Sequence, residues 1–173
     1  LGAAVFVHPW DMLAPERMTR HWLPWLVGMP AELAIAIASV VLGGVLDRQP
    51  TLRLLFAHGG GAFPGLLGRV EAGFHARPDL AATATATEPR QSVRRIYVDS
   101  LTHDPDTLRF IAGIVGEDRI ALGTDYPFPL GEAVPGATIE ALTELPQAIR
   151  QRMLSGTAEA FLGGRRVYPI RAS

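Results

Sequence analysis

The sequence predicts an α/β protein in which four consecutive strand–helix units build a parallel sheet. Three observations support this prediction. Short apolar runs occur four times along the 173 residues, a helical pattern follows each run, and a histidine or an aspartate stands where each run ends. Strands that alternate with helices are typical of parallel sheets, because a helix must carry the chain back to the same edge of the sheet. We expect a single domain over residues 1–173.

Apolar runs and their flanking prolines and glycines give the expected elements. The strands are expected at residues 3–7, 52–57, 95–98 and 119–124, and the helices at 30–42, 64–74, 104–115 and 135–162, the last with a break near Ser155 and Gly156. Pro30 suits the first turn of its helix, which is apolar almost all round, as expected of a helix packed against a sheet. Residues 80–88 are low in complexity and predict a flexible surface loop.

Composition excludes several classes of protein. The formal net charge is −1, from 16 basic and 17 acidic residues, so we expect no bulk attraction to nucleic acid or to a membrane surface. The absence of cysteine excludes disulfide scaffolds and cysteine-ligated zinc, and the absence of lysine excludes Schiff-base enzymes. Gly, Pro or charge interrupts each apolar run before the roughly 18 residues that a membrane helix needs. With no basic leader at residues 1–10, we expect a cytoplasmic protein.

The polar residues at the predicted strand ends are the main candidates for chemistry. They are His8, His58, Asp99 and Asp125. Because functional groups gather at the carboxyl ends of parallel strands, His8 and Asp125 could hold a divalent metal and His58 could act as a base. The glycines after His58 would let the backbone approach a ligand closely. Each histidine taken alone is more often a structural hydrogen-bonding residue, and Asp99 could instead satisfy loop backbone groups.

Two interpretations stay open for the other conspicuous residues. Arg69 and Arg77 follow His58 by 11 and 19 residues, and they could lie on a solvated helical face or recognise a carboxylate. The tryptophans could wall a pocket, although buried packing is the expected state for Trp10, Trp22 and Trp25. The histidines expected on the surface are His21, His75 and His103.

Several longer strings are more specific than the spacing of single residues. They are HPWDM at 8–12, PWLVGMPAE at 24–32, FAHGGGAFP at 56–64 and LGTDYPFPLGE at 122–132. Through these strings the chain resembles the C-terminal half of the aminocarboxymuconate semialdehyde decarboxylase family, a branch of the amidohydrolase superfamily, over about residues 1 to 163. The resemblance implies a (β/α)8 TIM barrel, here about its last four βα units, with one divalent metal, usually Zn2+, at its C-terminal mouth.

The resemblance also implies roles for individual residues. His8 and Asp125 match two metal ligands, and His58 matches the histidine that activates the metal-bound water. Arg69 matches an arginine that reaches the neighbouring subunit's site in a homodimer and holds a substrate carboxylate, and Arg77 is similarly placed. The residues that match the pocket wall are Trp25, Phe128 and Met12. The implied reaction is nonoxidative decarboxylation of a muconate semialdehyde, or a close aromatic carboxylate, in tryptophan or nitroaromatic breakdown.

The chain departs from the family pattern mainly by what it lacks. A whole barrel takes eight strands and about 250 residues, and the family's His-x-His pair on the first strand does not occur here. We therefore expect this chain alone to have little or no activity on its small-molecule carboxylate substrate. Two alternatives stay open. One is a metal-dependent hydrolase of lactones or amides, and the other is a non-catalytic half-barrel whose open sheet edges require a partner.

Overall fold

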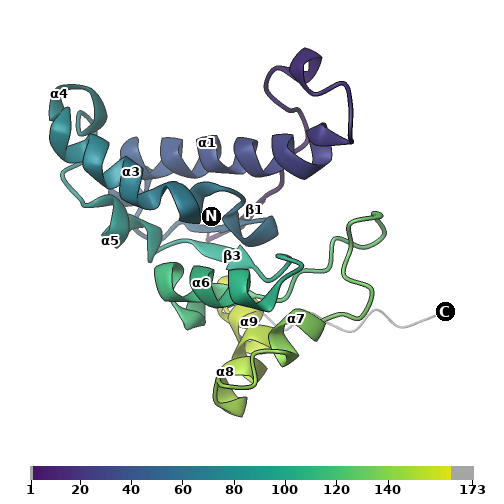
Figure 1. The fold of residues 1–173 in the computed structure, drawn as a ribbon. Helices are drawn as coiled ribbons and strands as arrows, with labels where there is room; N and C mark the ends of the chain where they lie inside the picture. Colours follow the sequence, from purple (N-terminus) through teal and green to yellow (C-terminus); the bar gives the residue numbers. More distant parts are fainter. Residues whose placement is uncertain (1, 165–173) are drawn as a thin grey trace.

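The computed structural model describes residues 2–164, and these build one four-stranded sheet (Figure 1). The strands are β1 (Ala4–Val7), β2 (Arg53–Phe56), β3 (Tyr97–Asp99) and β4 (Ile120–Ala121). They lie in the order β1-β2-β3-β4, and every neighbouring pair is parallel. The predicted α/β fold is confirmed. Four parallel strands in chain order, each joined to the next through helices, are about half of a closed barrel.

The helices belong to three crossovers and a C-terminal group. The first crossover contains η1 (Pro15–Arg17), η2 (Pro24–Gly28), α1 (Met29–Leu42) and α2 (Val45–Arg48). The second contains η3 (His58–Gly60), α3 (Phe63–Ala76), α4 (Pro78–Ala81) and α5 (Pro89–Val93), and the third contains α6 (Pro105–Val115) and η4 (Glu117–Arg119). After β4 come α7 (Ala137–Glu140), α8 (Gln147–Gln151), η5 (Arg152–Gly156) and α9 (Thr157–Phe161).

One face of the sheet carries the main hydrophobic core. Leu54 and Phe56 of β2 point to this face, where α1, α3 and α6 cover them. In Figure 1, α1 and α3 lie side by side over the sheet. The side chains that these three helices bury almost completely include Leu33, Ile37, Phe63, Leu67 and Leu108. Each such burial stabilises the fold by about 1.5–3 kcal/mol before side-chain entropy is subtracted.

The opposite face of the sheet is covered only in part. Side chains alternate along a strand, so Leu55 points away from the main core. It packs with Tyr97 of β3 and with Phe161 of α9, whose ring centroid lies 5.4 Å from that of Tyr97. On the edge strand β1, in contrast, Phe6 pairs with Leu55, points to the same face and is 56% exposed. Half of a barrel therefore leaves part of its inner, apolar surface open to solvent.

The segment at residues 80–88 differs from the expected flexible surface loop. It joins α4 to α5, and Thr85 Oγ1 donates a hydrogen bond to the Asp47 carboxylate on α2. The same carboxylate accepts a hydrogen bond from Arg95, at a distance of 2.7 Å. The low complexity of the sequence gave no indication of these contacts. Small polar residues such as Thr85 are enough to hold the segment against α2.

Two other boundaries also differ from expectation. The break expected near Ser155 and Gly156 coincides with η5, a π-helical turn that interrupts the α-helical geometry between α8 and α9, although the chain stays helical throughout. The helical region is also interrupted earlier, between α7 and α8. Strand β4 is shorter than expected because the backbone N–H of Gly123 donates to Ser100 Oγ, at 3.3 Å, instead of continuing the strand ladder.

The expectation that no apolar run could span a membrane is wrong for one helix. Residues Pro24–Leu42, which combine η2 and α1, form a helix of 19 residues with a mean hydropathy of 1.9. By length and composition alone it could cross a membrane, and 33% of the window is buried inside the protein. Core helices pass the same test, and Ile37 and Val41 of α1 are packed into the main core.

Candidate metal centre

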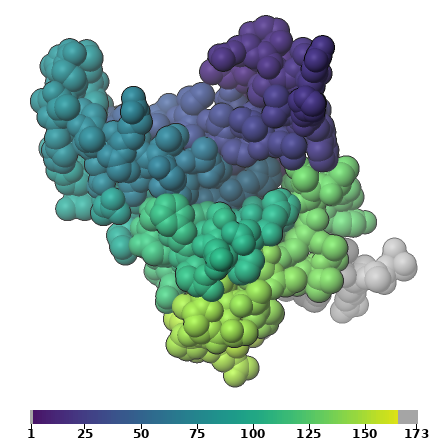
Figure 2. Space-filling view, in the orientation of Figure 1, coloured from purple at the N-terminus to yellow at the C-terminus, as the bar shows by residue number. Residues whose placement is uncertain are grey.

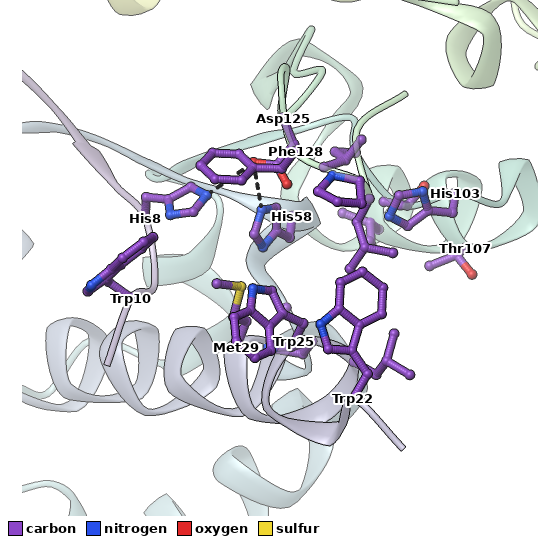
Figure 3. Close-up of a pocket in the computed structure, with 18 residues that line it drawn as sticks. His8, Trp10, Trp22, Trp25, Met29, His58, His103, Thr107, Asp125 and Phe128 are labelled. Atoms are coloured by element: carbon purple, nitrogen blue, oxygen red, sulfur yellow. Dashed lines mark hydrogen bonds and ion pairs between the residues drawn. The ribbon is translucent and has the colours of Figure 1, made fainter. Parts of the chain in front are cut away.

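Three of the predicted site residues converge at the carboxyl ends of the strands. His8 Nε2 lies 3.3 Å from Asp125 Oδ1, and His58 Nε2 lies 3.6 Å from the same oxygen. The two imidazole rings meet edge to face, with their centroids 4.8 Å apart. Figure 3 shows both rings beside the Asp125 carboxylate. One possible ligand atom from each residue lies within 4.8 Å of the other two, as a metal centre requires.

The backbone turns sharply where two of these residues stand. His58 and Asp125 have φ values of 52° and 53°, in the left-handed region that residues with a Cβ rarely adopt. Strain of this kind persists only where the surroundings enforce it, and it is common at functional sites. β1 and β4 are the two edge strands, yet the side chains of His8 and Asp125 meet. In Figure 2 the purple N-terminal segment lies against the green segment near residue 125.

The glycines after His58 are required by the packing of the protein itself. A Cβ on Gly61 would lie 2.5 Å from the Pro30 carbonyl oxygen at the start of α1, and Gly61 has a φ of 60°. A Cβ on Gly59 would lie 2.8 Å from Ile111 Cδ1 of α6. Gly61 also lines the cavity, so the expectation that these glycines allow close approach to a ligand stays a prediction beside this structural reason. They let the loop that carries His58 fit between α1 and α6.

Asp99 holds the loop after β2, which carries His58, in place. Its carboxylate is buried and accepts hydrogen bonds from the backbone N–H groups of Gly59, at 2.9 Å, and Leu101, at 3.1 Å. Burial raises the pKa of this carboxyl to about 6, and the hydrogen bonds oppose the rise. Of the two interpretations that the sequence left open, the hydrogen bonds favour the structural one. Asp99 satisfies loop backbone groups and thereby sets the position of His58.

The environment of His58 suits a neutral imidazole. Burial lowers the pKa of His58, and the nearby Asp125 carboxylate partly offsets this effect. Its Nε2 atom is buried and has no hydrogen-bond partner in the protein. An unpaired buried nitrogen is costly, so its position beside another imidazole and a carboxylate suits an electrophilic ligand such as a metal ion. Two nitrogens and one oxygen at these distances fit a divalent ion such as zinc or manganese.

A cavity of about 260 Å³ adjoins this centre. His8, His58 and Asp125 line it at one end, and predicted wall residues Trp25 and Phe128 are among its sides. The remaining lining is mostly apolar, and it comes from the loops after the four strands, the segment before α1, the start of α1, and α6. Its other members are Trp10, Trp22, Leu26, Met29, Pro30, Gly61, Leu101, Thr102, His103, Thr107, Ile111, Pro129 and Leu130.

Three residues expected at the site lie outside this cavity. Met12 is half-buried and packs next to Gly28, where a Cβ would come within 2.7 Å of its side chain. Arg69 is exposed on α3, and Arg77 is exposed just after it. The Arg77 guanidinium forms two hydrogen bonds with Asp79, at 2.8 and 2.6 Å. Within one chain, neither arginine contributes to the cavity wall.

The sequence interpretation missed three residues that line the cavity. Trp10 and Trp22 were expected in buried packing, but they are 74% and 43% exposed and face the cavity. His103 was expected on the surface, and it is exposed, yet it also lines the cavity. A signal was available for His103, because it follows Asp99 closely at the end of a predicted strand. The tryptophans carried no comparable signal, since their segment forms no strand.

Comparisons with known proteins agree with this geometry. The model of the amidohydrolase family matches residues 1–164. The chain belongs to the amidohydrolase family. The 2-amino-3-carboxymuconate-6-semialdehyde decarboxylase of Dictyostelium discoideum is 53% identical to this amidohydrolase chain over 163 residues, 94% of this chain and 45% of the relative. The protein of the same name from Caenorhabditis elegans is 46% identical over 155 residues, 89% of this chain and 39% of the relative.

The family resemblance found in the sequence is thus confirmed, and this amidohydrolase chain spans less than half the length of these two relatives. Among solved structures, 5-carboxyvanillate decarboxylase LigW from Sphingomonas paucimobilis matches with a TM-score of 0.80 and 20% identity, over 94% of this chain and 50% of that one. Dihydroxybenzoic acid decarboxylase from Polaromonas sp. JS666, with bound manganese, matches with a TM-score of 0.75 and 19% identity, over 96% and 52%. The fold is a partial barrel of the amidohydrolase type.

Two substitutions of Asp99 separate its hydrogen bonds from its charge. In Asp99→Asn the amide oxygen can keep both bonds to the loop, so we expect the free energy of unfolding at neutral pH to change by less than about 1 kcal/mol. Asp99→Ala leaves two buried N–H groups unpaired and should cost about 2–4 kcal/mol. Urea unfolding measures both values. An Asn variant as unstable as the Ala variant would show that the loop depends on the charge.

Proposed function

We propose that this chain supplies one half of a divalent-metal centre that decarboxylates a planar, conjugated carboxylate, with aminocarboxymuconate semialdehyde as the expected substrate. The observation that carries the proposal is the convergence of His8, His58 and Asp125 beside a cavity with aromatic walls. The decarboxylases among the relatives support the reaction class. Zinc or manganese suits the donor set, and manganese is bound in one of the similar structures.

Each side chain of the centre has its own task in this proposal. His8 Nε2 and the Asp125 carboxylate hold the ion, and a His-x-His pair that this sequence lacks completes its ligands. A bound divalent ion supplies Lewis acidity, which stabilises negative charge on oxygen. His58 accepts and returns a proton, because burial lowers its pKa and so favours the neutral ring, which has one nitrogen free to accept. Loss of carbon dioxide leaves an electron pair on carbon, so the reaction ends with delivery of a proton.

The cavity walls orient the substrate and exclude water. Trp25 and Phe128 line the cavity close to the metal ligands, and the flat rings suit a conjugated, planar molecule. Apolar walls also lower the local dielectric constant, which strengthens the interaction between a carboxylate and the cationic centre. These walls favour a small carboxylate over a bulky or polymeric substrate.

Arg69 is proposed to act in a second subunit. It lies outside the cavity of its own chain, and the family resemblance assigns the matching arginine to the neighbouring site of a homodimer. A guanidinium group binds carboxylate through two parallel hydrogen bonds, which suits recognition of a second substrate carboxylate. Arg77 is the weaker candidate because Asp79 already occupies its guanidinium.

A chimaera tests the proposed reaction. The part of the Dictyostelium discoideum relative that precedes its match to this chain would be fused to residues 1–173 and loaded with Zn2+ or Mn2+. We expect metal-dependent loss of the muconate semialdehyde absorbance, and a fall of at least about 1,000-fold in kcat with Asp125→Ala, because a ligand is lost. The 173-residue chain alone should show little or no activity. A folded, metal-loaded chimaera without turnover would rule out the assignment.

Mixing two inactive chimaeras tests the assignment of Arg69. If each site combines its own Asp125 with the partner's Arg69, a dimer of one Arg69→Ala and one Asp125→Ala chain has one intact site. Random reassociation of equal amounts should then restore about a quarter of the wild-type activity. The measurement is kcat per chain after subunit exchange. No recovery above the separate variants, despite demonstrated exchange, would show that Arg69 does not act across the interface.

A further inference from the structure

The cavity has a second polar end, opposite the metal centre. Thr102 and His103 belong to the loop after β3, and Thr107 lies in the first turns of α6. Figure 3 shows His103 and Thr107 on the side of the cavity away from His8 and Trp10. Most of the remaining lining is apolar.

Only one hydrogen-bond donor at this second end is free for a ligand among the described residues. Thr102 Oγ1 donates to the Asp104 carbonyl oxygen at 3.0 Å, and Thr107 Oγ1 donates to the Asp104 carboxylate at 2.6 Å. The ring of His103 forms no hydrogen bond or ion pair within residues 2–164. An imidazole ring always carries at least one N–H group, so His103 retains a donor.

The backbone holds His103 in place at a cost in free energy. Its φ of 60° is in the left-handed region, as for His58 and Asp125. The loop is fixed on both sides, because Thr102 N donates to the Ser100 carbonyl oxygen at 2.9 Å and Asp104 caps α6 through the N–H of Thr107. Residues that bind ligands are often held in a strained backbone conformation by hydrogen bonds on both sides, as His103 is here.

We propose that His103 binds the far oxygen of the substrate. In this arrangement a planar, conjugated carboxylate places one carboxylate at the metal end, lies between the apolar walls, and accepts a hydrogen bond from the His103 ring through a second oxygen. The inference rests on the proposed function and narrows its substrate class to molecules with oxygen acceptors at both ends. A monocarboxylate makes no hydrogen bond to the His103 ring and should therefore bind less tightly.

Tryptophan fluorescence can test this inference on the chain as it exists. All three tryptophans line the cavity, so a ligand that enters it changes their emission. Isophthalate and benzoate, which differ by one carboxylate, are titrated into the chain with Zn2+ present. We expect isophthalate to bind about tenfold more tightly than benzoate, the usual contribution of a hydrogen bond to a charged group. Benzoate binding should require Zn2+.

His103→Gly should abolish the difference between the two ligands and leave benzoate affinity within about twofold of the wild type. Glycine accepts the left-handed backbone, so the loop is not strained further. His21→Gly is the matched control, because His21 is also exposed, has a φ of 57° and does not line the cavity. It should keep the tenfold preference. Circular dichroism and thermal unfolding establish that both variants fold.

The outcomes distinguish this inference from the proposed function. If both ligands bind in a Zn2+-dependent way but His103→Gly retains the preference for isophthalate, the assignment of His103 is wrong and the metal centre stands. The assignment of His103 is also wrong if the wild type binds both ligands equally well. If neither ligand binds, or if binding is independent of Zn2+, the assignment of His103 is wrong, and metal-dependent turnover by the chimaera decides the proposed function separately.

Discussion

The site depends on how closely the loop after β2 packs against the protein on both sides. Gly61 meets the start of α1 at a distance that no side chain would allow, and Gly59 meets α6 in the same way. Asp99 then holds the loop through the N–H of Gly59. These contacts force the left-handed backbone of His58 and turn its ring toward Asp125. Without these contacts, we expect the loop to relax to a backbone conformation without the left-handed residue, and His58 would then no longer face Asp125.

The same loop links the hydrophobic core to the chemistry. α1 and α6 are core helices, and each presents one end to the cavity, so the packing that stabilises the sheet also fixes the cavity walls. The half-barrel still brings the two proposed ligands, His8 and Asp125, together with the proposed base His58, because all three stand at strand ends of a single sheet. What it leaves open is the inner face near β1, where Phe6 is exposed. A second set of strands would cover that surface and bring further ligands to the same mouth.

Much of this arrangement could be predicted from the sequence, for identifiable reasons. The four strands and the convergence of His8, His58 and Asp125 follow from apolar runs that end in polar residues. The role of the glycines could not be predicted, because it depends on α1 and α6, which are distant in sequence. Trp10 and Trp22 were expected in buried packing because their segment has no periodicity. His103 is exposed as expected, and only its place in the cavity wall was not foreseen. The reaction class came from family strings, since the geometry alone fits hydrolysis equally well.

Calorimetric titration of the 173-residue chain with Zn2+ would show whether His8 and Asp125, beside His58, bind a metal ion. We expect about one ion per chain, with binding weakened at least about tenfold by Asp125→Ala or His8→Ala. His75→Ala, which removes an exposed histidine on α3, should leave the affinity unchanged. Absence of binding by the folded wild type, or equal affinity in Asp125→Ala, would contradict the assignment of His8 and Asp125 to a metal centre.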